Sequence, residues 1–362
     1  MGLSTGKHSP AMTDVAAHAG VSHQTVSRVL NNHPNVRPAT RNRVEAAIAE
    51  LGYRPNRSAR ALATHTTNTI GILMTGTAQF GPASTVIAID IAARARGYFT
   101  SMASLPDNDR ASALQGLDQL VSQGVDGIIV VATNTSVADA VDNASLPCPV
   151  VVVAARPEIP ADSRTRYVYA DQRQGARLAI EHLTVLGHRR IAHISGPLAS
   201  FDAAERLSTY EALMAELSLP VQVYPAGDWS AQRGYEVGLE LARDVGKPDG
   251  PTAVFCANDM IALGLLRALW EAGLRVPEDV SIVGFDDIEV SAFLVPELTT
   301  VRQPFAEVGA VAVATLLAEL QSLATTDAEL AAEQAPQIPG TSEPCLVVRK
   351  STKSPVGFGN GE

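Results

Sequence analysis

The sequence predicts an N-terminal all-α headpiece followed by an α/β body that contains two doubly wound parallel sheets. The first observation is a set of three short helical segments within residues 12–51. The second is an alternation of strand and helix patterns after Thr69 that is longer than one doubly wound sheet requires. The third is charge: residues 1–65 carry eight basic and three acidic side chains, although the chain as a whole has a net charge of −10. A segment with a net charge of +5 on a body of −15 indicates an electrostatic anchor attached to a different kind of domain.

Length and composition exclude several classes of protein. The 362 residues are 46% hydrophobic and 18% charged, which is enough for real cores and excludes wholesale disorder. The longest apolar runs are of strand length, short of the roughly 18 residues of a membrane helix, so no membrane partner is expected. Three cysteines without a CxxC pair argue against a disulfide framework or a structural metal site. Residues 1–10 lack the apolar stretch of a secretory signal, and a cytoplasmic protein is expected.

The ends of the headpiece helices follow from local chemistry. The helices are expected at Thr13–Ala19, at His23–Leu30 and from Pro38 to Leu51. Thr13 and Ser22 are the expected N-caps, and proline is favourable at the start of a helix. Gly20 permits the positive φ of a tight turn, and the small Ala16 lets two helices cross steeply. This is a helix-turn-helix pattern.

The outward face of the second helix carries residues that can read bases. It presents His23, Gln24, Ser27 and Arg28. Glutamine pairs with adenine, and arginine pairs with O6 and N7 of guanine in the major groove. The alternative is an ordinary helical hairpin with a solvated polar face. The basic excess and the base-competent residue types favour double-stranded DNA as the partner.

The body is expected to alternate strands with helices. Strands are expected at Ile70–Met74, Tyr98–Ala103, Gly127–Val131, Val150–Val153, Ile191–Ile194, Ala253–Cys256 and Ser281–Phe285. Helices are expected at Val86–Arg96, Ser112–Gln123, Gly175–Leu186, Ala203–Ser218, Arg233–Arg243, Ile261–Ala272 and Ala306–Gln321. Ligands of such sheets bind at the carboxyl ends of the strands, in the crevice between lobes.

Polar residues follow several of these strands. Asn258 and Asp259 come after one strand, and Asp286 and Asp287 come after another. With Arg206, they supply the acceptors and forked donors that vicinal hydroxyls need. Trp229 could stack on the apolar face of a sugar ring, and simple packing is the alternative. Asp259 could be a helix cap, Asp287 could be structural, and Arg206 could pair with Glu205 or Glu211.

In combination, these motifs resemble the lactose repressor and galactose repressor family of bacterial transcriptional regulators. The resemblance covers about residues 12–349 and rests on Asp14–Asn31, Thr40–Asn56, Gly187–Ala192, Asn258–Gly264, Val283–Asp287 and Leu298–Val301. It implies a body that is folded like a periplasmic sugar-binding protein and needs no cofactor or metal. The expected domains are a headpiece at 1–55, a hinge at 56–66, a body at 67–349 and a disordered tail at 350–362. The body divides into an N-lobe of about 67–170 and 302–331 and a C-lobe of about 171–301 and 332–349.

The resemblance also implies DNA contacts. It places His23, Gln24 and Arg28 on base edges, with phosphate contacts from neighbouring polar residues. It makes residues 56–66 a hinge helix whose Leu62 wedges into the minor groove, although a lone leucine among alanines is more often a core residue. The full expected set is His23, Gln24, Arg28, Ser22, Thr25, Ser27, Asn31, Arg41, Asn56, Arg57, Ala59 and Leu62. Two hinges that meet on a pseudo-palindromic operator require a homodimer, and residues 350–362 show no apolar heptad for a larger assembly.

The expected effector is a sugar or glycoside. The full implied set is Arg206, Asn258, Asp286, Trp229, Phe305, Pro82, Ser84 and Asp202. Ala154 and Val131 replace an acidic residue and an asparagine of a galactoside-binding pattern, and Asp202 replaces a serine, so a recast pocket is expected. The chain is thus interpreted as a repressor of a carbohydrate-utilisation operon that the sugar releases from its operator. The alternatives are a corepressor-dependent regulator and a sugar-binding transport protein. An enzyme is not expected, because no phosphate loop, dinucleotide fingerprint or nucleophile elbow is present.

Overall fold

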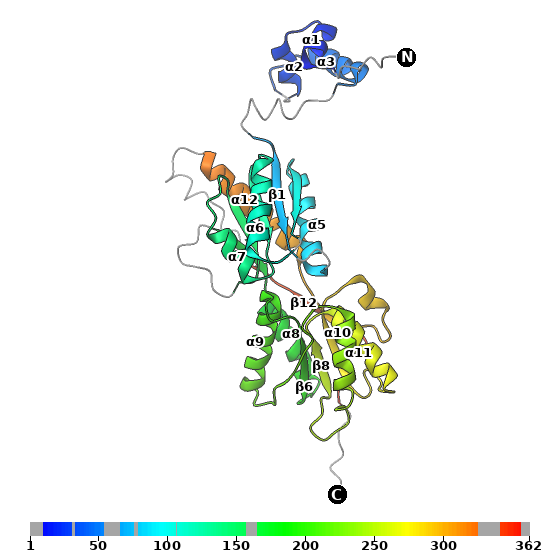
Figure 1. Ribbon diagram of the computed structural model, residues 1–362. Helices are drawn as coiled ribbons and strands as arrows, with labels where there is room; N and C mark the ends of the chain where they lie inside the picture. The colour runs from blue at the N-terminus through cyan, green and yellow to red at the C-terminus, as the bar shows by residue number, and fades with distance from the viewer. Residues whose placement is uncertain are drawn as a thin grey trace, which may run out of the picture. The chain divides into compact units, whose positions relative to one another are not determined.

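The computed structural model divides the chain into two compact units, residues 1–67 and 68–362 (Figure 1). It describes residues 10–30, 33–53, 66–75, 79–105, 107–156, 165–324 and 341–355. The described residues of the first unit form the helices α1 (Met12–Ala19), α2 (His23–Leu30) and α3 (Pro38–Leu51). The second unit contains the helices and strands of the body.

The three headpiece helices enclose a small apolar core. Its buried members are Val15, Ala16, Ala19, Val26, Val29, Val44, Ala47 and Tyr53. Gly20, with a φ of 60°, ends α1 in the left-handed conformation that glycine adopts at little cost. The N–H of Val21 then donates to the carbonyl of Ala16 at 3.0 Å, which closes the turn before α2. The expected helix-turn-helix is therefore present.

One of the two expected caps is wrong. Thr13 lies inside α1, which begins at Met12, and the carboxylate of Asp14 accepts a hydrogen bond from the N–H of Ala11 at 2.7 Å. A carboxylate in the first turn satisfies that donor without help from threonine. The cap at Ser22 is confirmed, since its Oγ accepts from the N–H of Thr25 at 3.2 Å.

The described residues of the body form two six-stranded sheets. The first has the order β11-β5-β4-β3-β1-β2, and its strands are β1 (Thr69–Met74), β2 (Phe99–Ser104), β3 (Gly127–Val131), β4 (Val150–Val153), β5 (Arg166–Ala170) and β11 (Thr341–Ser342). The second has the order β12-β10-β9-β8-β6-β7, and its strands are β6 (Ile191–Ser195), β7 (Gln222–Pro225), β8 (Ala253–Cys256), β9 (Ser281–Asp286), β10 (Thr299–Arg302) and β12 (Cys345–Val347). All neighbouring strands are parallel except β10 and β12.

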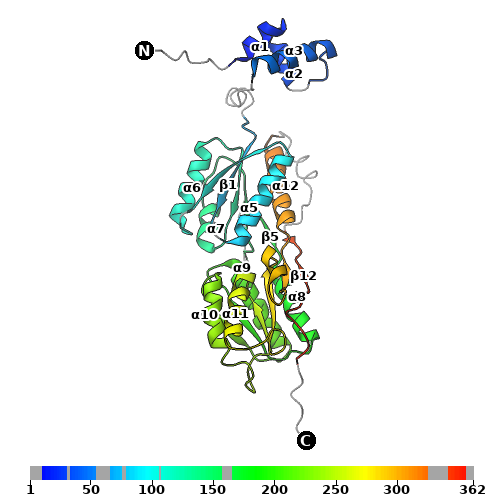
Figure 2. The same cartoon turned by 90° about the vertical axis from the view of Figure 1, so that its right-hand side faces the viewer.

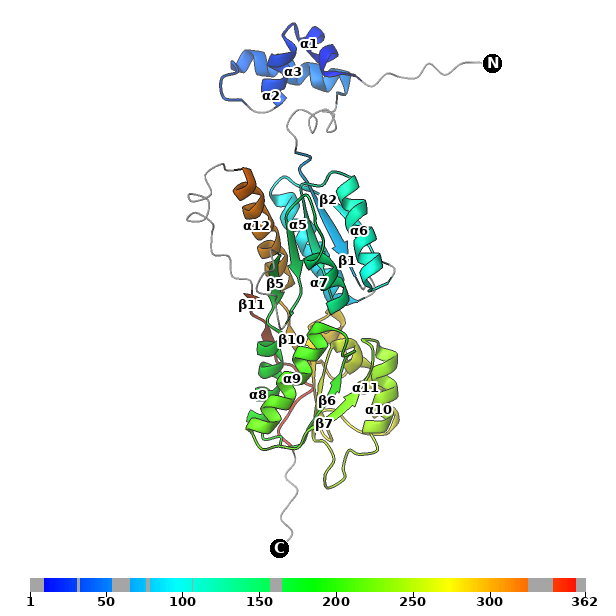
Figure 3. The same ribbon diagram turned by 60° about the vertical axis from the view of Figure 1, so that its left-hand side comes forward.

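Helices cover both faces of each sheet (Figures 2 and 3). The first sheet lies between α6 (Arg110–Ser122) with α7 (Thr135–Asp142) and α5 (Phe80–Ala95) with α12 (Phe305–Ala324). The second lies between α8 (Gln172–Val185) with α9 (Phe201–Glu216) and α10 (Ala231–Leu241) with α11 (Asp259–Glu271). The predicted pair of doubly wound sheets is therefore confirmed, with one antiparallel edge strand that was not expected.

The expectation that no segment is as long and apolar as a membrane helix is wrong for α12. Over Phe305–Leu323 it is long and apolar enough to cross a membrane, by length and composition alone. Its residues Val308, Ala312, Val313 and Leu316 are buried against the first sheet. Packing on the sheet accounts for this apolar face, although only 28% of the apolar stretch is buried.

The chain passes between the two sheets three times in its described part. The crossovers lie at 170–172, 302–305 and 342–345. The N–H of Asp171 donates to the carbonyl of Ser342 at 3.0 Å, which joins the first crossover to the third. The crossovers of the two lobes are therefore joined to one another by hydrogen bonds.

Several expectations about the body are wrong in detail. The sequence patterns did not predict β5, β7, β10, β11, β12 or α7, which are short or partly polar. Residues 341–342, expected in the C-lobe, form β11 of the first sheet.

The expected disordered tail begins too early. Ser351 is fully buried, its Oγ accepts from the N–H of Thr299 at 2.8 Å, and its carbonyl accepts from the N–H of Ile282 at 2.8 Å. The Nε2 of His188 lies 2.9 Å from the carbonyl of Lys353. These partners lie far away in the sequence, so local composition could not reveal them. Residues 356–362 lie outside the described part of the chain.

We predict that Gly264→Ala lowers the stability of the body. A Cβ at Gly264 would lie 2.0 Å from the carbonyl oxygen of Ala231, where α10 and α11 touch, and overpacking of this kind costs about 1–3 kcal/mol. Urea unfolding followed by tryptophan fluorescence measures it, because Trp229 and Trp270 both lie in the second unit. Gly81→Ala is the control, since its Cβ would meet nothing closer than 3.8 Å. Equal midpoints for the two variants would contradict the close approach.

Candidate nucleic-acid interface and candidate ligand cleft

The outward face of α2 is free of core contacts. Val26 and Val29 are buried on its inner side, whereas His23, Gln24 and Arg28 are exposed. Thr25 and Ser27 are partly buried beside them, and Ser22 is exposed at the start of the helix. Spacings of three and four residues place these polar side chains on one surface. The structure therefore brings the predicted base-reading residues together.

Arg41 has a structural task in addition to its predicted phosphate contact. Its Nη2 donates to the carbonyl of His33 at 3.2 Å, and its Nη1 lies 3.5 Å from the carbonyl of Val29. These contacts tie α3 to the carboxyl end of α2. The orientation of the reading helix thus depends on Arg41. The other predicted DNA contacts, Asn31, Asn56, Arg57, Ala59 and Leu62, lie outside the described residues.

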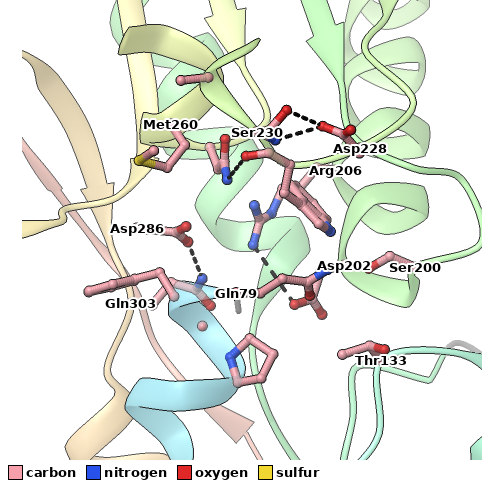
Figure 4. Close-up of a pocket in the computed structure, with 16 residues that line it drawn as sticks. Gln79, Thr133, Ser200, Asp202, Arg206, Asp228, Ser230, Met260, Asp286 and Gln303 are labelled. Atoms are coloured by element: carbon pink, nitrogen blue, oxygen red, sulfur yellow. Dashed lines mark hydrogen bonds and ion pairs between the residues drawn. The ribbon is translucent and has the colours of Figure 1, made fainter. Parts of the chain in front are cut away.

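A cavity of about 350 Å³ lies between the two lobes of the body (Figure 4). The first lobe contributes Gln79, Phe80, Gly81, Pro82 and Thr133, and the second contributes Ser200, Asp202, Arg206, Asp228, Trp229, Ser230, Ala231, Asn258, Met260, Asp286 and Gln303. An adjoining cavity of about 50 Å³ includes Phe305, Val131 and Ala154. Of the eight predicted ligand residues, only Ser84 lines neither cavity.

Arg206 is a buried cation, with 2% of its surface exposed. Its Nε and Nη2 donate to Oε1 of Gln172 at 2.9 and 2.8 Å, and its Nη1 donates to the carbonyl of Ala257. Its guanidinium lies 3.7 Å from the centre of the Phe285 ring. Burial lowers the pKa of Arg206, and nearby carboxylates oppose that shift. The group is held rigidly at the cleft.

The suggested pairing of Arg206 with Glu205 or Glu211 is not what the structure shows. Glu205 pairs with Arg173. In the part of the chain that the structure describes, the one ion-pair partner of Arg206 is Asp202, 4.0 Å away. Asp202 is 42% exposed at its side chain and accepts no hydrogen bond from another described residue. Partial burial raises the pKa of Asp202, and Arg206 opposes this.

The helix cap that the sequence suggested at Asp259 is Asn258 instead. Asn258 caps α11, because its Oδ1 accepts from the N–H of Ile261 at 2.8 Å. Its Nδ2 donates to the carbonyl of Trp229 at 3.2 Å and so holds that residue at the cleft. Asp259 is fully buried and accepts from Ile288 N–H, Ser291 Oγ and Thr300 Oγ1, at 2.9, 2.7 and 2.5 Å. Burial raises the pKa of Asp259 to about 6.

Asp286 lies at the end of β9 with 8% of its surface exposed. Its Oδ1 accepts from Nε2 of Gln303 at 2.6 Å. Burial raises its pKa to about 7, and the positive charge of Arg206 opposes the shift. Its φ of 112° is uncommon for a residue with a side chain, and such conformations gather at functional sites. Its neighbour Asp287 is structural, since it pairs with Arg302 and Arg349 at 2.6 and 2.7 Å.

Aromatic rings line both sides of the cavity. Phe80 and Phe305 stand edge to face, with ring centres 5.8 Å apart. On the other lobe, the ring of Trp229 occupies the space that a Cβ at Gly196 would need, 2.7 Å away. Apolar rings beside hydrogen-bonding groups suit a ligand with both apolar faces and hydroxyl edges.

Comparison with known proteins decides the family. Residues 11–56 match the bacterial regulatory proteins of the lacI family, and residues 180–352 match the periplasmic binding protein-like domain. The chain is 35% identical to the lactose operon repressor of Escherichia coli K12 over 343 residues, which is 94% of this chain and 90% of that protein. The chain belongs to the lacI family of bacterial regulatory proteins.

Other lacI-family proteins extend the similarity. The transcriptional regulator CelR of Thermobifida fusca is 36% identical over 82% of this chain and 87% of its own length. Among solved structures, a lac repressor dimer bound to operator and the anti-inducer ONPF has a TM-score of 0.81 at 33% identity, covering 96% of this chain and 100% of that one. A CelR–cellobiose complex has a TM-score of 0.65 at 30% identity, covering 94% and 99%. The predicted fold class agrees with these structures.

Sequence reasoning missed several residues of this lacI-family cleft. Gln79 and Thr133 follow β1 and β3, so the carboxyl ends of those strands were an available signal. Gln303 follows β10, a strand that sequence patterns did not predict, and Gln172 joins Arg206 to it. Neither glutamine carried a signal of its own.

We predict that Asp286→Asn stabilises the protein at high pH. Because the Asp286 pKa is about 7 in the folded chain against an ordinary 3.8, the folded state binds more protons between those values. Its stability therefore falls as the pH rises from about 4 to about 7. The variant should be more stable by about 1–3 kcal/mol at pH 8, with the difference shrinking toward pH 4. Urea midpoints across this range measure it.

The control for this prediction has the opposite sign. Arg275 lowers the pKa of Asp279 to about 2, so Asp279→Asn should reduce stability at pH 8. If the Asp286→Asn protein is less stable than the parent at pH 8, burial of the ionised Asp286 carboxylate does not destabilise the folded protein.

Proposed function

We propose that this chain is a sequence-specific repressor of a carbohydrate-utilisation operon, released from a pseudo-palindromic operator when a sugar or glycoside binds the cleft. The observation that carries the proposal is the presence in one chain of two features. One is the exposed polar face of α2, and the other is a cavity of about 350 Å³ that both lobes line with aromatic and hydroxyl-binding groups. A lac repressor structure with operator bound, which covers 96% of this chain, supports the pairing.

The proposed DNA reader is residues 1–55 with the hinge 56–66. His23, Gln24 and Arg28 contact base edges, with Ser27 on the same reading face, while Ser22, Thr25, Asn31 and Arg41 contact the phosphate backbone. In the hinge, Leu62 enters the minor groove, which bends the DNA toward the protein. The net charge of +5 on residues 1–65 makes this binding strongly salt-dependent. Since DNA is the proposed partner, the protein acts in the cytoplasm, at the nucleoid.

The body at 67–349 is the proposed sensor and dimerisation domain. Ile87 and Ile91, four residues apart on α5, are each 61% exposed, and Met102 of the edge strand β2 is 50% exposed. Phe293 and Val295 of the second lobe are exposed by 78% and 93%. Apolar surface of this extent marks contact sites, and a second copy of the chain is the occupant we propose.

The charges of the cleft favour an uncharged effector. Asp202, Asp228 and Asp286 face the cavity, against the single guanidinium of Arg206. Three of its five N–H groups already donate to Gln172 and Ala257, so few donors remain for an anion. Asp202 and Asp286 accept hydrogen bonds from hydroxyls, Asn258 donates, and Trp229 stacks on the ring. The solved complex of the relative CelR contains cellobiose, which supports a neutral sugar. We propose binding without turnover.

We predict that operator selection from a random DNA library yields a two-fold symmetric site. Arg28→Ala should then weaken binding by about 1–3 kcal/mol and relax the preference at one base pair in each half-site. Arg43→Ala is the control, because this exposed arginine lies on α3 and not on α2. An Arg28→Ala protein with unchanged sequence preference and a smaller salt dependence would make Arg28 a phosphate contact.

We predict that only neutral sugars release the selected operator. The test is a gel-shift titration with cellobiose, lactose, maltose, glucose 6-phosphate and glucuronate. Asp202→Asn should reduce the discrimination against the two anionic sugars, because it removes one carboxylate from the cavity. Release by an anionic sugar alone would overturn the charge argument. Operator binding that a sugar strengthens would make the effector a corepressor.

A further inference from the structure

We infer that Gln172 and Gln303 form a hydrogen-bond relay that transmits effector binding at Arg206 and Asp286 to the crossovers between the two lobes. This inference rests on the proposed function and assigns the two glutamines as positioning residues. Neither glutamine needs to touch the effector for this role. Their position between two proposed ligand-binding charges is the reason to consider them together.

The relay is continuous and buried. Arg206 donates through Nε and Nη2 to Oε1 of Gln172, at 2.9 and 2.8 Å. Nε2 of Gln172 donates to Oε1 of Gln303 at 3.0 Å. Nε2 of Gln303 donates to Oδ1 of Asp286 at 2.6 Å, a step that Figure 4 shows beside the cavity. Gln172 and Gln303 are only 4% and 7% exposed, so water replaces these partners poorly.

The two ends set the direction of every bond in the relay. The guanidinium of Arg206 only donates, which fixes the orientation of both amides, and Asp286 accepts at the other end in its ionised form. Turning either amide around would therefore place a donor against a donor or an acceptor against an acceptor. Bonds that all point the same way polarise one another, so a change at one end alters the strength of the others.

The charges at the two ends are not paired directly. Among the residues that the structure describes, Arg206 forms an ion pair with Asp202 and not with Asp286. The two amides stand between Arg206 and Asp286 in the hydrogen-bond chain. Effector hydroxyls that engage either charge therefore compete with, or reinforce, the bonds to the glutamines.

The middle bond of the relay joins two crossovers. Gln172 lies where the chain first enters the second lobe, and its Nε2 is also 3.3 Å from the carbonyl of Ala170. Gln303 lies where the chain returns from β10 to α12. The neighbouring bond from Asp171 to Ser342 adds the third crossover. Bending at these crossovers changes the Gln172–Gln303 geometry, and a change in that bond shifts the balance between lobe arrangements.

Two isosteric variants cut the relay at different places. Gln172→Glu still accepts from Arg206 but can no longer donate to Gln303. Gln303→Glu still accepts from Gln172 but can no longer donate to Asp286. Gln174→Glu is the matched control, because it makes the same change on α8 at a residue outside the relay. Gln172→Met and Gln303→Met remove the same bonds without adding charge, in case a glutamate disrupts folding.

The measurement is the ratio of operator affinities without and with saturating sugar. Fluorescence anisotropy of labelled operator gives this ratio for cellobiose, lactose and maltose, tested separately on the full chain. Calorimetry of sugar binding without DNA gives the affinity of the cleft itself. For the parent we expect a ratio of about 5–150 for the active sugar. Each relay variant should lower this ratio at least tenfold, or to one where the parent ratio is below ten. Its operator affinity without sugar should change by less than about threefold.

The relay also predicts non-additivity. The Gln172→Met/Gln303→Met double variant should lose no more of the ratio than either single variant, because both cut one chain. If the two glutamines only stabilise the crossovers, the variants would lower thermal stability and leave the ratio unchanged. That result overturns the inference. The inference would also be overturned if a variant bound the sugar more weakly but kept the parent ratio of operator affinities at saturating sugar. A parent protein that binds its operator but responds to none of the sugars would instead overturn the proposed sugar response.

Discussion

The burial of one positive charge organises the body of this protein. Arg206 has almost no exposed surface, and a guanidinium can be buried only where acceptors and negative charge surround it. The amide of Gln172 and the carbonyl of Ala257 supply the acceptors, and the ring of Phe285 lies against its face. Asp202 and Asp286 supply the charge, and burial raises the pKa of both carboxyls. The cleft is therefore charged and rigid, and the carboxyl of Asp202 accepts no hydrogen bond from another described residue. Such a cleft suits a polar ligand without charge of its own.

Small residues and strand ends create the space for these groups. Gly196 leaves room for the Trp229 ring, and Gly284 leaves room for Asp259, whose Oδ1 would lie 2.1 Å from an added Cβ. Asp259 in turn fixes the loop after β9 through the N–H of Ile288. Because the sheets are parallel, the carboxyl ends of their strands bring residues of distant sequence to one crevice. The cavity between the lobes follows from this topology.

The headpiece follows a different physical rule. Its core is small, and α2 keeps Val26 and Val29 inside while its polar face stays exposed. The separation of charge between residues 1–65 and the acidic remainder means that attraction to a polyanion is concentrated in the small unit. In the proposed function, the response to sugar is a competition between this attraction and the lobe arrangement that the effector favours.

The sequence by itself determined what depends on neighbours along the chain. The α1–α2 turn followed from Gly20 and Ser22, α3 from Pro38, and the strands Gly127–Val131, Val150–Val153 and Ala253–Cys256 from short apolar runs. The motifs that identified the family, such as Asp14–Asn31, are also runs of adjacent residues. These signals are readable because caps, turns and buried strands are built from adjacent residues.

Only the tertiary structure decided which distant groups meet. It assigned the cap of α11 to Asn258 and gave Asp259 to a loop 29 residues away. It paired Arg206 with Gln172 instead of a nearby glutamate, and it joined Gln172 to Gln303 across 131 residues. It also buried Ser351 beside Ile282 in a segment whose composition suggested disorder. The physical reason is common to all of these. A buried polar group forms hydrogen bonds with the partner that the packed sheets bring within reach, and neighbouring residues in the sequence do not indicate which partner that is.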